Sequence, residues 1–294
     1  MMTCLSSAFN VEDVDIEKAL AEVASVVGER PQLVTTRAGQ PWVGLTTDCA
    51  IHIAHDDRTR ARIREEADRL GWAARNGIPV PAVVEARPDW LVTTRAVNDG
   101  VTTGRAYVEA AVAAARAIAG AEEPPPSLRA PVAAHGGGRW AGLVRLSRIV
   151  RSPLPPGEFR AVRAAAAGLP RDRLAHGDYV LHNILFDRAK SSVTVIDWEF
   201  LSRAPAHQDL LMLWPRLEEA GDRALVLEEV ERAAADRPGG ELRRAGVLHH
   251  WLAVRYLADL VTKFAPGEWN RPRIDAAVAR LAEARATRAR WEKA

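Results

Sequence analysis

Lysine and cysteine are scarce in this chain of 294 residues, and long hydrophobic runs are absent. Its two cysteines, Cys4 and Cys49, are too few for a disulfide framework and have no spacing suited to a zinc site, which fits a reducing compartment. No run of about 18 apolar residues is available to span a bilayer. Residues 1–10 also lack the basic and hydrophobic regions of a secretory signal. We therefore expect a cytoplasmic protein with no membrane partner.

An excess of one charge sign is absent as well, because 40 basic residues face 38 acidic ones and leave a net charge of +2. This balance provides no bulk electrostatic reason to expect a nucleic-acid partner. Hydrophobic residues make up 48% and charged residues 27% of the chain, as in ordinary folded proteins. The basic residues are 36 arginines and four lysines, with no lysine between Lys18 and Lys190.

The first third of the sequence alternates strand patterns with helix patterns. Apolar spacing predicts a helix over residues 14–27, then strands over 32–36, 42–46 and 49–55 that can form an antiparallel meander. Asp56 and Asp57 can cap a second helix that ends before Gly77. Another buried strand is predicted over residues 90–94.

From Arg105 the sequence favours helices. A helix is predicted to run to Ile118, and a proline-rich segment (122–126) and a triple glycine (136–138) then predict a loop. Further helices are predicted over residues 156–167, 206–219, 223–235, 241–264 and 273–291. The pattern as a whole indicates two lobes, one rich in strands and one mainly helical.

The segment from residue 174 to 197 carries the chemistry. Two short hydrophobic strands, 184–186 and 193–196, flank a polar turn and so predict a hairpin. Asn183 precedes the first strand and Asp197 follows the second, so their oxygen atoms should emerge at the same end and can share a hard cation. Asp178 lies in the loop that leads into the hairpin.

The pattern His176-Gly177-Asp178, then Asn183, then Asp197 closely resembles the signature of the aminoglycoside-phosphotransferase and choline-kinase families. This resemblance implies that Asp178 is the catalytic base, that Asn183 and Asp197 are Mg²⁺ ligands, and that His176 shapes the loop. It also implies ATP or GTP as the phosphoryl donor.

Further segments extend the resemblance across residues 30–265. Asp209 matches an aspartate that braces the catalytic loop, and Glu66 matches a glutamate of the small-lobe helix. Residues near Thr94 and Ala96 match the hinge whose backbone meets the nucleotide base. The implied fold is α+β and two-lobed, like that of protein kinases. Its small antiparallel-sheet lobe (1–96) would bind nucleotide, and its larger helical lobe (97–294) would hold the catalytic residues and the acceptor.

The chain departs from these families at one position. Relatives place a strand lysine beside the helix glutamate, whereas this chain has His52 at or near that place. An unperturbed histidine has a pKa of about 6.5 and is mostly neutral in the cytoplasm. Arg37 is the other candidate for holding phosphates, because a guanidinium is always charged. The nearby glycines, Gly39 and Gly44, do not form a recognisable phosphate loop.

The sequence thus predicts transfer of the γ-phosphoryl group of ATP or GTP to a hydroxyl of a small molecule, such as an antibiotic, an amino alcohol, a sugar or a nucleoside. A peptide Ser/Thr kinase and a pseudokinase scaffold are the alternatives, the latter because of the missing lysine.

Two local patterns leave other interpretations open. His176, Asp178, His182 and Asp197 also suit a metallohydrolase. The segment 218–241 holds eight acids and three arginines, which would attract a cationic acceptor or simply form a solvated helix face. His249 and His250 lie in a helical pattern and are interpreted as packing and surface residues.

Overall fold

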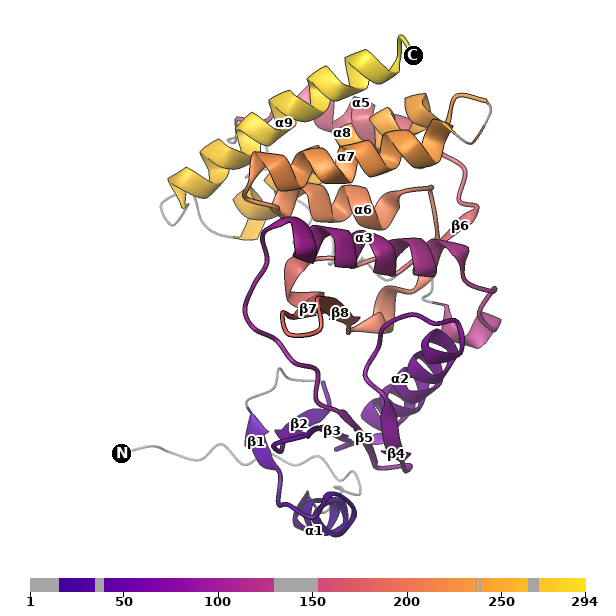
Figure 1. Cartoon of the computed structure of the whole chain (residues 1–294), viewed down its shortest axis with the longest axis vertical. Helices are drawn as coiled ribbons and strands as arrows, with labels where there is room; N and C mark the ends of the chain where they lie inside the picture. The colour runs from indigo at the N-terminus through magenta and orange to yellow at the C-terminus, as the bar shows by residue number, and fades with distance from the viewer. Residues whose placement is uncertain (1–15, 35–39, 130–152, 236, 238, 264–269) are drawn as a thin grey trace. The chain divides into compact units, whose positions relative to one another are not determined.

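The computed structural model describes residues 16–34, 40–129, 153–235, 237, 239–263 and 270–294, without the side chain of residue 156. The chain divides into two compact units, Met1–Val97 and Asn98–Ala294 (Figure 1). The first unit contains a sheet with two helices, and the second is mainly helical. This confirms the predicted α+β class with a small antiparallel sheet and a larger helical part. No helix in the described ranges is long and apolar enough to cross a membrane.

The first unit is built on one antiparallel sheet of five strands in the order β1-β2-β3-β5-β4. Its elements in chain order are α1 (Ile16–Val27), β1 (Gln32–Val34), β2 (Trp42–Leu45), β3 (Cys49–Ile53), α2 (Asp57–Arg75), β4 (Val83–Ala86) and β5 (Trp90–Thr94). The predicted meander of the first three strands is confirmed. The sequence did not predict β4, whose mostly exposed residues show no alternation at the sheet edge.

The two helices of this unit contact the sheet through opposite faces of β3. Ile51 and Ile53 are fully buried in a core that α1 completes with Leu20 and Val23. Side chains alternate along a strand, so His52 points to the other face. There it contacts Glu66 of α2. The alternation of side chains along β3 therefore puts the packing residues on one face of the sheet and the His52–Glu66 pair on the other.

The second unit surrounds a small hairpin with helices. Its elements are α3 (Arg105–Gly120), η1 (Pro126–Leu128), α5 (Pro156–Ala167), β6 (Arg173–Ala175), η2 (Leu181–Asn183), β7 (Ile184–Asp187), β8 (Ser192–Val195), η3 (Trp198–Phe200), β9 (Ser202–Ala204), α6 (Gln208–Leu213), η4 (Trp214–Arg216), α7 (Ala220–Ala235), α8 (Glu241–Lys263) and α9 (Arg271–Trp291). The pairs β6-β9 and β7-β8 are both antiparallel.

Buried aromatic rings join the helices of this unit to the hairpin. Tyr107 of α3 packs edge to face on Phe186 of β7, with ring centroids 5.8 Å apart. His249 of α8 lies against Trp214, at 4.2 Å between centroids, and is fully buried. His249 therefore packs in the core, as the sequence indicates.

One predicted helix is wrong in length. The sequence favoured a helix over residues 206–219, but α6 ends at Leu213 and a 3-10 turn follows. Pro215 explains the break, because its ring cannot donate the backbone hydrogen bond that a continuing helix needs. Because α6 begins at Gln208, Asp209 lies in its first turn, where it contacts the site described below.

We expect the cap of α2 to set the stability of the helix that carries Glu66. Asp56 accepts a hydrogen bond from the Thr59 backbone at 2.7 Å, and the Thr59 hydroxyl accepts one from the Asp56 backbone at 3.0 Å. Asp56→Ala removes this capping box and should lower the free energy of unfolding by about 1 kcal/mol. Chemical denaturation measures this change. Asp56→Asn still caps and should cost much less, and equal losses in the two variants would contradict the capping role.

Candidate active site

The hairpin of β7 and β8 places Asn183 and Asp197 at one end. Ile184 pairs with Val195, and the Ile196 N–H donates to the Asn183 carbonyl at 3.0 Å. Asp197 is the next residue after this pair. The predicted hairpin is therefore confirmed, with Asn183 and Asp197 at the same end of it.

Asp178 and Asn183 are in direct contact. The Asn183 side-chain nitrogen donates to the Asp178 carboxylate Oδ2 at 3.1 Å and to the Asp178 carbonyl at 3.0 Å. Both acceptors face Nδ2, which settles the orientation of the amide, so Oδ1 is the atom that can coordinate a cation. Asn183 is 2% exposed, and Asp178 is half-buried. This contact joins the loop to the hairpin.

His176 connects the same loop to the end of β8. Its Nε2 lies 3.0 Å from the Ile196 carbonyl, which can only accept, so Nε2 carries the proton. Nδ1 is then the acceptor for the Asp178 backbone N–H at 3.4 Å. Burial lowers the pKa of His176 to about 4, which keeps the ring neutral and preserves this tautomer near neutral pH.

Asp209 contacts the backbone of the loop that leads to Asp178 through both of its carboxylate oxygens. Oδ2 accepts from the His176 backbone N–H at 2.7 Å and Oδ1 accepts from that of Gly177 at 3.1 Å. Burial raises the pKa of Asp209 to about 7, against these two donors, which favour the ionised form. The aspartate is 5% exposed, so its role is positioning.

Gly177 and Asp197 of this site have left-handed backbone conformations. Gly177 has a φ of 83°, and a Cβ there would lie 2.4 Å from the Phe200 carbonyl oxygen, so this position requires glycine. Asp197 has φ 64° and ψ 67°, which is uncommon for a residue with a side chain. Such conformations are often found at functional sites, because the surrounding structure must hold them in place.

Tyr179 is a supporting residue that the sequence analysis did not single out. Its hydroxyl donates to the Ala111 carbonyl of α3 at 2.6 Å, and the side chain is fully buried. Burial raises the pKa of Tyr179 well above its usual value, so the hydroxyl remains a donor. Only its place beside Asp178 in the sequence hinted at this anchoring role.

In the first unit, His52 and Glu66 form the predicted pair. The His52 Nδ1 lies 2.8 Å from the Glu66 Oε2, and both side chains are partly exposed, at 26% and 29%. The histidine thus occupies the position next to the helix glutamate where the resemblance implies a lysine.

Of the other residues predicted to bind nucleotide, the structure describes Thr94 and Ala96 but not Arg37. Thr94 ends β5, and its hydroxyl accepts from the Ala82 backbone N–H at 2.9 Å. Ala96 follows in an extended segment and is half-buried. Arg37 and Gly39 lie outside the described residues. Gly44 has a packing reason, because a Cβ there would lie 2.9 Å from the Pro31 Cβ.

The metallohydrolase alternative conflicts with the geometry of His176. Both of its ring nitrogens interact with backbone groups, which leaves neither for a metal ion. Within the described residues, no group of three or more His, Cys, Asp or Glu side chains is placed to hold a metal. A two-ligand site of Asn183 and Asp197 does not need such a cluster, since Mg²⁺ usually keeps several waters and substrate oxygens.

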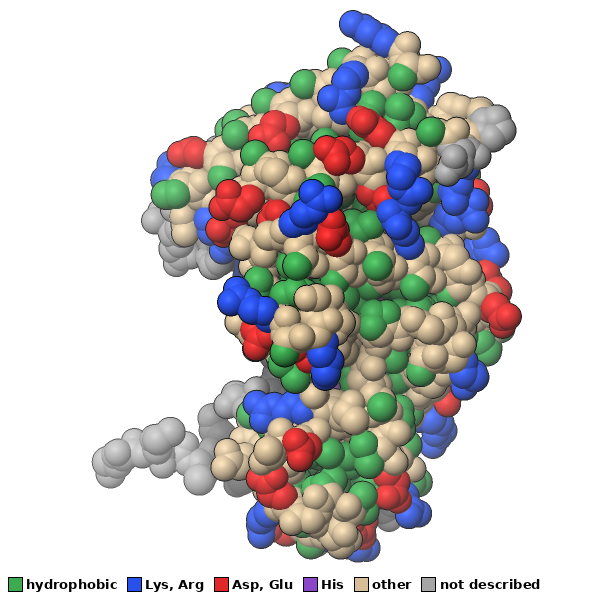
Figure 2. Space-filling model, in the orientation of Figure 1, with side chains coloured by type: hydrophobic (Ala, Val, Ile, Leu, Met, Phe, Trp, Pro, Cys, Tyr) green, Lys and Arg blue, Asp and Glu red, His purple; other side chains and the backbone are tan. Residues whose placement is uncertain are grey.

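Acidic residues of the segment 218–241 form ion pairs with arginines. Arg116 and Arg232 both contact Glu229, and Arg244 lies 2.7 Å from Glu241. Figure 2 shows basic and acidic side chains interspersed over this part of the helical unit. These pairs favour the interpretation of the segment as a structural, solvated face over that of a site for a cationic acceptor.

Solved structures with the same fold include several kinases of small molecules. A choline/ethanolamine kinase family protein from Mesorhizobium loti is 19% identical, with 92% of this chain and 94% of that chain covered and a TM-score of 0.54. A macrolide 2′-phosphotransferase from Brachybacterium faecium is 16% identical, with 90% and 98% covered and a TM-score of 0.54. An amicoumacin kinase in complex with AMP-PNP and Ca²⁺ is 13% identical, with 93% and 94% covered and a TM-score of 0.55.

Fold and site together define a phosphotransferase with a protein-kinase-like architecture. No curated protein matches the sequence. The sequence model of the phosphotransferase enzyme family matches residues 32–246, which is most of the chain. The chain belongs to this family.

We expect the turn at Gly177 to tolerate no side chain. Gly177→Ala adds a Cβ 2.4 Å from the Phe200 carbonyl oxygen and forces a positive φ on alanine. It should lower the free energy of unfolding by about 2 kcal/mol or more. Gly100→Ala is the matched control, because Gly100 also has a positive φ, 69°, but no atom within 4 Å of an added Cβ. Similar losses in both variants, measured by denaturation, would show that the contact with Phe200 is unimportant.

Proposed function

We propose that this chain transfers the γ-phosphoryl group of ATP to a hydroxyl of a small molecule, with Asp178 as the base and with Asn183 and Asp197 as the ligands of Mg²⁺. The observation that carries the proposal is the contact between Asp178 and Asn183 at 3.1 Å, next to the strand end that leads into Asp197. It supports a site in which one loop and hairpin supply a carboxylate base and two oxygen ligands.

The residues present fit a magnesium ion. Asn183 uses its amide nitrogen to bind Asp178, which leaves its Oδ1 as a neutral oxygen ligand, and Asp197 supplies a carboxylate. When bound, Mg²⁺ would neutralise charge on the phosphate oxygens. The backbone contact of Ile196 with Asn183 keeps the two ligand-bearing residues in register.

Asp178 has the position of a base that accepts a proton from the acceptor hydroxyl. Its Oδ2 accepts a hydrogen bond from Asn183, and its backbone N–H donates to His176. These contacts orient the carboxylate and leave Oδ1 to accept from a substrate hydroxyl. A half-buried position gives a substrate access to this oxygen.

In the first unit, the His52–Glu66 pair would take the place of the lysine–glutamate pair of relatives. Glu66 orients the imidazole at 2.8 Å, and a protonated ring could then contact phosphate oxygens. Arg37 is the second candidate for this role. Thr94 ends β5, and Ala96 follows it at the position proposed for the hinge. The N–H and C=O of Ala96 make no hydrogen bond within the described part of the chain, so they can serve as partners for a nucleotide base.

The proposed acceptor is a small molecule that carries a hydroxyl. The kinases of similar fold are named for choline or ethanolamine, a macrolide and amicoumacin, which supports a small-molecule acceptor without selecting one. Within one fold, substrate choice is decided by the site and not by the architecture.

We expect Mg²⁺-dependent ATP binding that depends on Asp197. Calorimetric titration of the full chain with ATP and excess Mg²⁺ should show binding, and Asp197→Ala should weaken it by about tenfold or more, because a metal ligand is lost. Asp275→Ala, at an exposed aspartate of α9, is the matched control and should bind like the wild type. Titration with GTP in place of ATP identifies the preferred donor.

The same titration tests which residue takes the role of the phosphate-binding lysine that this chain lacks. His52→Ala should lower ATP affinity if the imidazole contacts phosphates, whereas a loss confined to Arg37→Ala would assign that role to the guanidinium. If the wild-type chain binds neither ATP nor GTP, the proposed activity is wrong and a pseudokinase remains.

We expect Asp178→Asn to separate catalysis from binding. Asparagine keeps the size of the side chain but cannot accept the hydroxyl proton, so the rate of phosphoryl transfer should fall by about 10²- to 10⁴-fold. ATP affinity should change little, because Asp178 is not a proposed metal ligand. The measurement is product formation with radiolabelled ATP across a panel of antibiotics, amino alcohols, sugars and nucleosides. A variant as fast as the wild type would rule out Asp178 as the base.

A further inference from the structure

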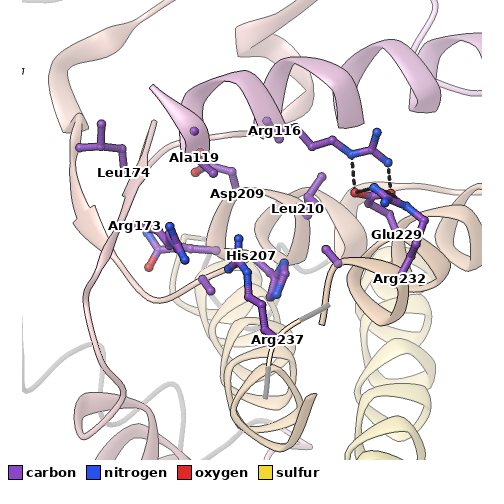
Figure 3. Close-up of a pocket in the computed structure, with 15 residues that line it drawn as sticks. Arg116, Ala119, Arg173, Leu174, His207, Asp209, Leu210, Glu229, Arg232 and Arg237 are labelled. Atoms are coloured by element: carbon purple, nitrogen blue, oxygen red, sulfur yellow. Dashed lines mark hydrogen bonds and ion pairs between the residues drawn. The ribbon is translucent and has the colours of Figure 1, made fainter. Parts of the chain in front are cut away.

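A second pocket lies within the helical unit and is distinct from the end of the hairpin. It has a volume of about 370 Å³ and is lined by residues from α3, β6, α6, α7 and the turns next to them (Figure 3). This volume is in the range of sites for small molecules. Asp209 is the only residue with a role in the proposed active site that also lines this pocket.

The lining carries an excess of positive charge. Four arginines line the pocket against two acids, Asp209 and Glu229, which leaves two positive charges in excess when both acids are ionised. The arginines are Arg116, Arg173, Arg232 and Arg237. The whole chain of 294 residues has a net charge of only +2, so this concentration of cations is local.

Glu229 neutralises only part of this charge. Arg116 donates to both of its oxygens, and Arg232 lies 2.9 Å from Oε1. Burial alone would raise the pKa of Glu229, but the hydrogen bonds from these arginines outweigh burial and lower it. One ionised carboxylate thus serves two guanidinium groups. Figure 3 shows this cluster on one side of the pocket, with Arg173, His207 and Arg237 on the other.

Two buried nitrogen atoms on that other side have no hydrogen-bond partner in the described part of the chain. They are the Nε of Arg173 and the Nε2 of His207. The His207 side chain is 7% exposed, and the Glu241 Oε1 lies 3.4 Å from its Nε2, which favours the tautomer with the proton on Nε2. A buried donor without a hydrogen bond is costly, so the Nε of Arg173 can donate to a ligand, whereas at the Nε2 of His207 a ligand would compete with the nearby Glu241 carboxylate.

Arg173 and Arg237 both act electrostatically on His207. Burial lowers the pKa of His207, and the positive charges of Arg237 and Arg173 lower it further, against the opposite effects of Glu241 and Glu229. The three side chains therefore lie within electrostatic range. An anion placed among them would accept hydrogen bonds from the planar guanidinium groups and would compete with the Glu241 carboxylate, whose Oε1 lies 3.8 Å from the Arg237 Nη1.

We propose that this pocket binds a small anionic molecule that carries phosphate or carboxylate groups, held by Arg173, His207 and Arg237. The site is separate from the proposed phosphoryl transfer and does not depend on it. Asp209 belongs to the wall of this pocket and also accepts the hydrogen bonds of His176 and Gly177. The pocket and the proposed catalytic loop therefore share one carboxylate.

The test is calorimetric titration of the full chain with inorganic phosphate and, separately, with citrate, in the presence of a chelator so that no metal-nucleotide complex contributes. We expect millimolar or tighter binding of at least one anion. Arg173→Gln and Arg237→Gln should each weaken it by about tenfold or more, because a charge-assisted hydrogen bond is lost. His207→Asn should weaken it as well, since asparagine tolerates the left-handed backbone but places no donor at the Nε2 position.

Arg105→Gln is the matched control, because Arg105 is an exposed arginine of α3 that lies outside the lining. It should bind the anions like the wild type, and thermal unfolding confirms that each variant is folded. Binding of phosphate alone assigns a phosphate ligand, binding of citrate alone assigns a carboxylate, and binding of both assigns a general anion site. No binding of either anion, or equal binding by wild type, Arg173→Gln and Arg237→Gln, would overturn the proposal.

Discussion

The buried carboxylate of Asp209 is the constraint on which the rest of the site depends. Its two oxygens accept hydrogen bonds from the backbone N–H groups of His176 and Gly177. Without Asp209, these two donors would lack partners. Burial of a carboxylate is costly, and the pKa raised to about 7 reflects this cost. The two hydrogen bonds offset part of it and fix the path of the chain into Asp178. A residue with no proposed chemical role thus decides where the carboxylate of Asp178 lies.

A chain of backbone contacts extends this constraint to the hairpin. The neutral ring of His176 connects Asp178 to Ile196, and the side chain of Asn183 connects Asp178 to the start of β7. Every member of this chain is either buried or half-buried, so water competes little for its hydrogen bonds. Asp178 and Asn183 are held by one network, and Asp197 directly follows Ile196, which belongs to it.

In this chain, arginines form most of the ion pairs that arginines and lysines share in other proteins. Guanidinium groups form bidentate ion pairs with buried or half-buried carboxylates, as in Arg116 with Glu229 and Arg285 with Glu158. His52 of β3, and not a lysine, lies beside Glu66 of α2, and four arginines line the second pocket. Scarcity of lysine therefore changes which side chains are available for phosphates and other anions.

The sequence by itself determined the family, the hairpin and the amphipathic elements, because these depend on spacings within one segment. Asn183 and Asp197 flank two short apolar strands, and the alternation of β3 places His52 opposite Ile51. Roles proposed for Asp178, Asn183, Asp197 and the nucleotide-binding residues remain predictions from that pattern.

Only the tertiary structure decided which distant segments meet. Strand β6 pairs with β9, the edge strand β4 joins the sheet, and α6 ends early before Pro215. The pocket around His207 combines residues from α3, β6, α6, α7 and the turns next to them, none of which shows a binding motif alone. The physical reason is that periodicity records how a segment buries its own face, whereas pairing and pocket formation depend on side chains that are far apart in the sequence.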